Sequence, residues 1–128
     1  MADKTKVLID TSAFVDFIRH GDDVIEMLFK EKIAYIHPFV AGELLLGGYP
    51  KDSRIMELIL KRKEPMTIST NSIEMMIDRT NAVNKRIGLI DCYLIAACMS
   101  ESMKLYTKDK NLAALAKEHS CLYNSQES

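Results

Sequence analysis

Short apolar runs alternate along the chain with longer segments whose apolar residues recur at helical spacing. The first run, KVLI at residues 6–9, is followed by Asp10 and then by Phe14, Phe17 and Ile18 on one helical face. We predict strands at residues 6–9, 33–36, 66–69 and 104–107, and an edge strand at 121–123. Helices are predicted at residues 14–20, 24–29, 39–47, 53–62, 71–87, 89–99 and 112–117.

Residues that favour helix ends mark several of these boundaries. Asp22 precedes the second helix, where its negative charge suits the N-terminal end of the helix dipole. Pro38 fits the first position of the third helix, and Gly47 fits its end. Asn71 is expected to cap the long fifth helix, and Gly88 is expected to end it.

Strands and helices alternate along the whole chain, and no internal repeat or linker divides it. This alternation predicts a parallel sheet covered on both faces by helices, because parallel strands need crossover connections. We therefore expect one α/β domain over residues 1–128, in three α/β/α layers with a central parallel sheet.

Composition and charge narrow the class of protein. A hydrophobic fraction of 48% and a charged fraction of 27% are ordinary for a globular protein and unlike those of a disordered chain. The 17 basic and 18 acidic residues give a formal net charge of -1, so any contact with nucleic acid would use a local basic patch.

The cysteines and the lengths of the apolar runs indicate where in the cell the protein is located. Cys92, Cys98 and Cys121 contain no C-x-x-C pair, which argues against a disulfide framework and a zinc knuckle and fits a reducing cytoplasm. The N-terminal apolar run is too short for a signal peptide, and no run of about 18 apolar residues predicts a membrane span. We expect a cytoplasmic protein with no membrane association.

Three carboxylates stand where the carboxyl ends of the strands are expected. Asp10 ends the first strand, Asp109 follows the strand at 104–107, and Asp91 lies at the start of the helix at 89–99. Ligands of open parallel sheets bind at that edge. An Asp at a helix start is also a common N-cap, so each of the three has a purely structural explanation as well.

Glu43 has no such explanation. It lies in the second turn of its predicted helix, beside Leu44 and Leu45, and no basic residue stands one helical turn away. Because an ionised carboxylate is rarely buried without a partner, we expect a cation to meet Glu43.

Four carboxylates brought together would repel one another unless a cation neutralised them. Oxygen ligands without Cys or a His cluster favour Mg²⁺ or Mn²⁺ over zinc. One such ion, or two about 4 Å apart, would activate a water and stabilise the leaving oxygen of a phosphodiester. Thr11 or Ser12, next to Asp10, is a candidate hydroxyl for this site, although Ser12 is equally suited to be a helix cap.

The motifs V-L-I-D-T-S, G-E-L-L-L-G, D-C-Y-L-I-A-A and L-Y-T-K-D-K-N-L stand in the order and approximate spacing of a known family. Over residues 7–123 the chain resembles the PIN-domain family, and within it the toxin nucleases of VapC type. The resemblance implies a PIN-like fold and Mg²⁺- or Mn²⁺-dependent hydrolysis of RNA by a toxin ribonuclease. It also implies a homodimer and a small antitoxin protein as partner.

The resemblance assigns roles to particular residues. It implies that the catalytic, metal-binding carboxylates are Asp10, Glu43, Asp91 and Asp109, and that the supporting hydroxyls are Ser12 and Thr107. The chain departs from the family pattern at Asn111 and Leu112, where relatives commonly carry a second acid and an aromatic residue.

Candidate RNA contacts are the basic residues nearest the acidic motifs in sequence, namely Arg19, Lys85, Arg86 and Lys108. The run at residues 61–63 has a simpler explanation, because cations favour the C-terminal end of a helix.

Three other classes of protein share parts of this pattern. A haloacid-dehalogenase phosphatase would carry a second Asp two residues after Asp10, where this chain has Ser12. A receiver domain would need an acidic pair near its first strand, and Asp22 and Asp23 are misplaced for that role. A non-catalytic PIN-fold module that binds RNA or protein stays open, although the presence of all four acids favours the enzyme.

Overall fold

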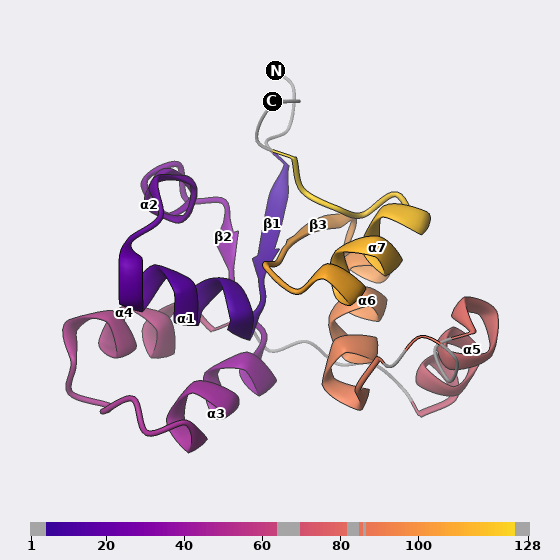
Figure 1. Ribbon diagram of the computed structural model, residues 1–128, viewed down its shortest axis with the longest axis horizontal. Coiled ribbons are helices and arrows are strands. Elements are labelled where there is room, and N and C mark those ends of the chain that lie inside the picture. Colours follow the sequence, from indigo (N-terminus) through magenta and orange to yellow (C-terminus); the bar gives the residue numbers. More distant parts are fainter. Residues whose placement is uncertain (1–4, 64–69, 82–84, 86, 125–128) are drawn as a thin grey trace.

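A sheet of parallel strands runs through the centre of the molecule, and helices lie on both sides of it (Figure 1). The computed structural model describes residues 5–63, 70–81, 85 and 87–124. In chain order, the elements found there are β1 (Lys6–Ile9), α1 (Thr11–His20), α2 (Asp23–Lys30), β2 (Ala34–Tyr35), α3 (Pro38–Leu46), α4 (Arg54–Arg62), α5 (Thr70–Thr80), α6 (Leu89–Glu101), β3 (Met103–Tyr106) and α7 (Lys110–Glu118).

Strand β1 lies between the other two strands, in the order β2-β1-β3. Helices α1 to α4 lie towards the β2 edge, and α5 to α7 lie towards the β3 edge (Figure 1). Three of the four β1 residues, Val7, Leu8 and Ile9, are fully buried, as expected for a central parallel strand. The predicted α/β fold with a central parallel sheet is confirmed.

The pairing of β1 with β3 sets the geometry of the sheet's carboxyl edge. Ile9 is in register with Tyr106, and the backbone N–H of Asp10 donates to the carbonyl of Tyr106 at 3.1 Å. The segments that follow the two strands therefore leave the sheet side by side, so residues near position 10 and near position 107 meet.

Several helices begin with a side-chain cap or a proline. Asp22 caps α2 by accepting from the backbone N–H groups of Val24 and Ile25. Pro38 occupies the first turn of α3, and Ser53 caps α4. Gly21 ends α1 with a φ of 77°, a conformation that favours glycine because it has no Cβ.

The predicted helix at 71–87 is wrong at both ends. Helix α5 begins at Thr70, so Asn71 lies inside it, and it ends at Thr80. The next residue, Asn81, has a φ of 55°, which terminates the helix. Gly88 is extended and precedes α6 as its N-cap instead of ending a helix.

Two predicted strands have different outcomes. Residues 66–69 lie outside the described residues, so the strand predicted there stays a prediction. At residues 121–123 the structure has a single parallel bridge between Leu105 and Leu122 instead of a full edge strand. Among the described helices, none has both the length and the apolar character that crossing a bilayer requires.

Leu8 and Leu46 provide a matched test of the core, because Leu8 is fully buried in β1 and Leu46 is 91% exposed at the end of α3. Leu8→Ala should lower the free energy of unfolding by about 2–5 kcal/mol, through lost burial and the cavity left behind. Leu46→Ala should change it by less than about 0.5 kcal/mol. Urea denaturation of the two variants measures both values, and equal losses would contradict this assignment of the core.

Candidate functional site

Asp10 is a carboxylate buried at the end of the central strand, with 4% of its surface exposed. Its Oδ1 accepts from the backbone N–H of Ala13 at 3.0 Å and so caps α1. The Ser12 hydroxyl lies 2.8 Å from the same oxygen, and the Thr107 hydroxyl donates to Oδ2 at 2.6 Å. Burial raises the pKa of Asp10 and outweighs these hydrogen bonds, which lower it.

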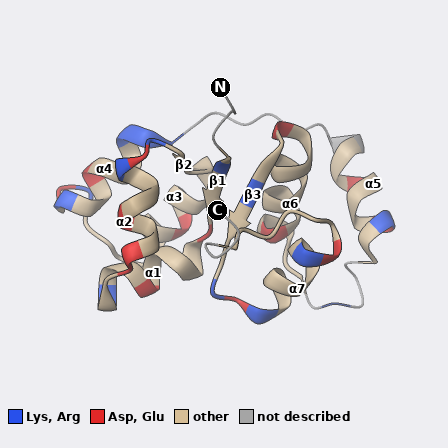
Figure 2. Ribbon diagram, turned by 90° about the horizontal axis from the view of Figure 1, so that it is seen from above, with Lys and Arg blue, Asp and Glu red and all other residues tan. Residues whose placement is uncertain are grey.

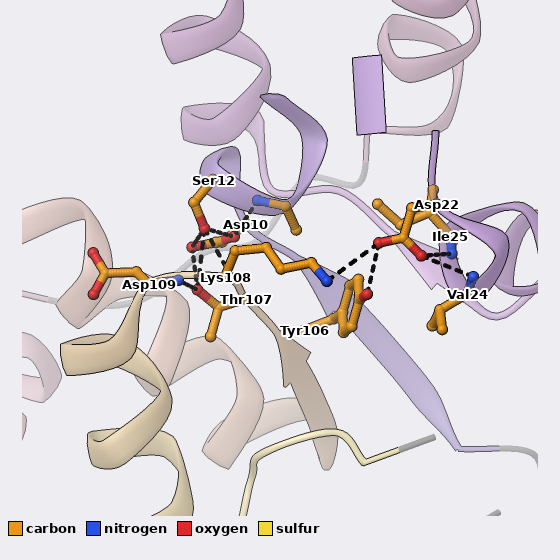
Figure 3. A network of polar contacts seen from close by, with 10 residues as sticks. Asp10, Ser12, Asp22, Val24, Ile25, Tyr106, Thr107, Lys108 and Asp109 are labelled. Atoms are coloured by element: carbon orange, nitrogen blue, oxygen red, sulfur yellow. Dashed lines mark hydrogen bonds and ion pairs between the residues drawn. The ribbon is translucent and has the colours of Figure 1, made fainter. Parts of the chain in front are cut away.

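The two supporting hydroxyls join α1 to the segment that follows β3 (Figure 3). The Oγ atoms of Ser12 and Thr107 lie 3.3 Å apart. Ser12 Oγ accepts from the backbone N–H of Lys108, and Thr107 Oγ1 accepts from that of Asp109, both at 3.0 Å. Ser12 therefore orients Asp10 and the β3–α7 connection, while Asp10 itself caps α1.

Asp109 stands at the start of α7 and is exposed. Its Oδ1 accepts from the backbone N–H groups of Asn111 at 2.9 Å and Leu112 at 3.1 Å, so it is an N-cap. The negative charge of Asp109 also raises the pKa of Asp10, which places the two carboxylates within electrostatic range of each other.

Asp91 lies in the first turn of α6 and links the acids of the site electrostatically. Its pKa is raised to about 6, first by burial and then by the charges of Asp109, Asp10 and Glu43. A hydrogen bond from the Gly88 backbone acts in the opposite direction. Three carboxylates from other parts of the chain thus lie close enough to Asp91 to raise its pKa.

Glu43 is half-buried on α3 and is met by a hydroxyl. Its Oε1 accepts from Thr11 Oγ1 at 2.6 Å. The ion pairs found in the described part of the chain join Lys85 to Glu118 and Lys108 to Asp22, and neither includes Glu43. Thr11 therefore supplies an uncharged donor to Glu43, and the cation expected to meet this carboxylate stays a prediction.

The chemistry of these donors fits a hard divalent cation. Each of the four acids offers carboxylate oxygen, the ligand that Mg²⁺ and Mn²⁺ prefer. Among the described residues, no three His, Cys, Asp or Glu side chains converge closely enough to hold an ion in their present rotamers. Binding of one ion by several of these acids would therefore require rotation of side chains that now accept from hydroxyl and backbone donors.

The candidate RNA contacts lie in different environments. Arg19 is exposed in the last turn of α1, and Lys85 is paired with Glu118 at 2.5 Å. Lys108 adjoins the site in sequence and points its ammonium group towards Asp22 (Figure 3). Arg86 lies outside the described residues. Lys and Arg occur on elements at both ends of the molecule (Figure 2).

Sequence reasoning missed two features near the site. Thr11 was considered only as a hydroxyl near Asp10, whereas it contacts Glu43, which lies 32 positions away in the chain. The contact between Tyr106 and Asp22 was not foreseen either. A Thr directly after an Asp at the end of a strand is only a weak indication that its hydroxyl meets another acid. Nothing local in the sequence indicates the contact between Asp22 and Tyr106, which are 84 positions apart.

Comparisons with known proteins identify the family of the chain. The family model described as PIN domain matches residues 7–118. The chain is 24% identical over 113 residues to Ribonuclease VapC32 from two strains of Mycobacterium tuberculosis, a match that covers 88% of this chain and 91% of the relative. The crystal structure of PAE2754 from Pyrobaculum aerophilum aligns with a TM-score of 0.64 at 15% identity, over 96% of this chain and 91% of that one, which supports the fold alone. The motif-based resemblance is thus confirmed, and the chain belongs to the PIN-domain family.

Proposed function

We propose that the protein is a Mg²⁺- or Mn²⁺-dependent endoribonuclease that hydrolyses RNA phosphodiester bonds. The observation that carries the proposal is the arrangement of Asp10, Glu43, Asp91 and Asp109, which come from four separate segments and lie near enough for the other three charges, after burial, to raise the pKa of Asp91. A protein gains no stability from gathering like charges, so this arrangement favours a role in binding a cation. The similarity to a protein named as a ribonuclease supports RNA as the substrate.

Asp10, Glu43, Asp91 and Asp109 are the proposed metal-binding and catalytic residues. When bound, a Mg²⁺ or Mn²⁺ ion would supply positive charge that neutralises the acids and polarises the phosphodiester. The hydroxyls that contact the acids fix their orientation, as partners of ligating carboxylates commonly do. Ser12 and Thr107 hold Asp10 in this way, and Thr11 holds Glu43.

The wider proposal follows from the similarity to a protein named VapC32. We propose that the chain is the cytoplasmic toxin of a toxin–antitoxin pair, that it forms a homodimer and that a small antitoxin protein is its partner. Arg19, Lys85, Arg86 and Lys108 are proposed to contact RNA phosphates. Lys85 would first have to leave Glu118, and exposed ion pairs are weak enough to exchange in this way.

Asp10→Asn tests the proposed catalytic role. The amide keeps an oxygen that can cap α1, so the fold should persist, while the charge that attracts the cation is lost. Cleavage of a random-sequence RNA pool with Mg²⁺ or Mn²⁺ should fall by about two orders of magnitude or more.

The matched control for Asp10→Asn is Glu26→Gln, which neutralises an exposed acid in α2. This variant should cut RNA at the native rate, and EDTA should stop cleavage by the native protein. Native-rate cleavage by Asp10→Asn, or cleavage that persists in EDTA, would contradict the proposal. RNA binding without cleavage would indicate the non-catalytic alternative.

Asp91→Asn tests the electrostatic cost of gathering the acids. Since the pKa of Asp91 is raised from 3.8 to about 6, ionisation of Asp91 opposes folding, and the cost grows as the pH rises through this interval. In EDTA, the variant should gain about 1–2 kcal/mol of unfolding free energy above pH 6, a figure reduced to allow for solvent screening. The gain should disappear near pH 4, as measured by urea denaturation across the pH range.

The control for this measurement is Asp78→Asn, which neutralises an exposed acid on α5 and should produce no such gain. Added Mn²⁺ should raise the melting temperature of the native protein more than that of Asp91→Asn, because a ligand stabilises the state that binds it. A loss of stability at neutral pH, or an equal gain at both ends of the pH range, would refute the electrostatic explanation.

A further inference from the structure

Asp22 is a half-buried residue beside the acid site, and it joins several segments. Its side chain is 7% exposed, and its Oδ1 accepts from the backbone N–H groups of Val24 at 2.8 Å and Ile25 at 3.3 Å. Its Oδ2 accepts from the Tyr106 hydroxyl at 2.6 Å and lies 3.6 Å from the Lys108 ammonium. Capping of α2 uses only Oδ1, so Oδ2 is left to bind two residues from the far end of the chain.

Tyr106 is the last residue of β3, and the Lys108 side chain extends along its ring towards Asp22 (Figure 3). The Lys108 ammonium lies 5.2 Å from the ring centroid, within the range of a cation–π contact. Burial raises the pKa of Asp22, but the hydrogen bonds from Tyr106 and from the Ile25 and Val24 backbone, together with the charge of Lys108, lower it by more, so the ionised carboxylate is favoured.

The same short segment is also attached to the acid site. Directly after Tyr106, the Thr107 hydroxyl donates to Asp10, and the Lys108 backbone N–H donates to Ser12. The Asp109 backbone N–H then donates to Thr107. In Figure 3, Tyr106 contacts Asp22 at one end of this segment, and Asp109 lies at its other end. The Asp109 carboxylate points the opposite way from the Lys108 side chain.

Residues 106–109 are therefore fixed at two points, the start of α2 and the start of α1. Loss of the Tyr106–Asp22 hydrogen bond would leave the half-exposed Lys108–Asp22 ion pair to join this segment to the start of α2. The placement of Thr107 and Asp109 would then depend mainly on the contacts at the acid site and on the pairing of β3 with β1. Small displacements of groups that position a reacting centre reduce reaction rates strongly.

We propose that the Tyr106 side chain is a positioning group for the acid site, and that its hydroxyl acts through the hydrogen bond to Asp22 rather than through contact with the four carboxylates. The proposal rests on the proposed function, since it assigns Tyr106 a part in placing Thr107 and Asp109 for that reaction. Lys108 strengthens the junction by sharing Asp22 Oδ2, which the sequence-based assignment of Lys108 to RNA binding did not anticipate.

Tyr106→Phe isolates the hydroxyl, because the ring and its packing against Tyr123, 6.0 Å away between centroids, are retained. The turnover number on RNA should fall about tenfold, as for loss of other groups that support a site, while KM stays within about twofold. Mn²⁺ affinity, measured by calorimetry, should also weaken. Tyr35→Phe is the control, because it removes a hydroxyl from β2, on the opposite side of β1.

Hydrogen exchange tests the positioning role independently of catalysis. In Tyr106→Phe, the amides of Lys108 and Asp109 should exchange about tenfold faster, because opening of the segment becomes easier. In Tyr35→Phe they should exchange at the native rate. Asp22→Asn should accelerate the same amides at least as much, because it weakens the Lys108 ion pair as well as the Tyr106 hydrogen bond. Addition of Tyr106→Phe to Asp22→Asn should then change the exchange little, because the two residues share one interaction.

Unchanged exchange at Lys108 and Asp109 in Tyr106→Phe, or a fall in thermal stability with native turnover and Mn²⁺ affinity, would overturn the inference. If the native protein neither cuts RNA nor binds Mn²⁺ while exchange still accelerates in Tyr106→Phe, the proposed function fails and the positioning geometry stands.

Discussion

The buried carboxylate of Asp10 is the constraint on which the arrangement of this site depends. Removal of an ionised group from water is costly unless hydrogen bonds replace the lost solvation. The donors that replace it are the Ala13 backbone and the hydroxyls of Ser12 and Thr107. Two of these donors belong to α1 and the third follows β3, so Asp10 can be satisfied only when these segments adjoin. The register of β1 with β3 provides that adjacency.

The same arrangement that satisfies Asp10 brings like charges together. Asp91 on α6 lies close enough to Asp109, Asp10 and Glu43 for the charges of these three acids to raise its pKa. Natural proteins accept such local costs at functional sites, where binding of a ligand offsets them. The position of the acids at the carboxyl edge of a parallel sheet agrees with where such folds bind ligands. Binding of the proposed cation would relieve the repulsion among these carboxylates, and this relief would favour binding.

Local patterns predicted most of the fold, and contacts across the sequence account for what they missed. Asp10 and Asp22 were identifiable at helix starts because a cap acts on backbone groups two or three positions away. The end of α5 was mispredicted because apolar spacing continued past Thr80, whereas the backbone turns at Asn81. Thr11 could not be assigned to Glu43 from sequence, since their hydrogen bond depends on how α1 packs against α3.

The most direct test of the central claim is anomalous diffraction from crystals soaked in Mn²⁺. The account predicts an anomalous peak between Asp10 and at least one of Glu43, Asp91 and Asp109, at oxygen–metal distances of about 2.1 Å. It also predicts that these side chains rotate towards the ion while Thr107 keeps its place beside Asp10. A saturating soak that leaves no peak among the four acids, or a peak held elsewhere on the protein, would contradict it.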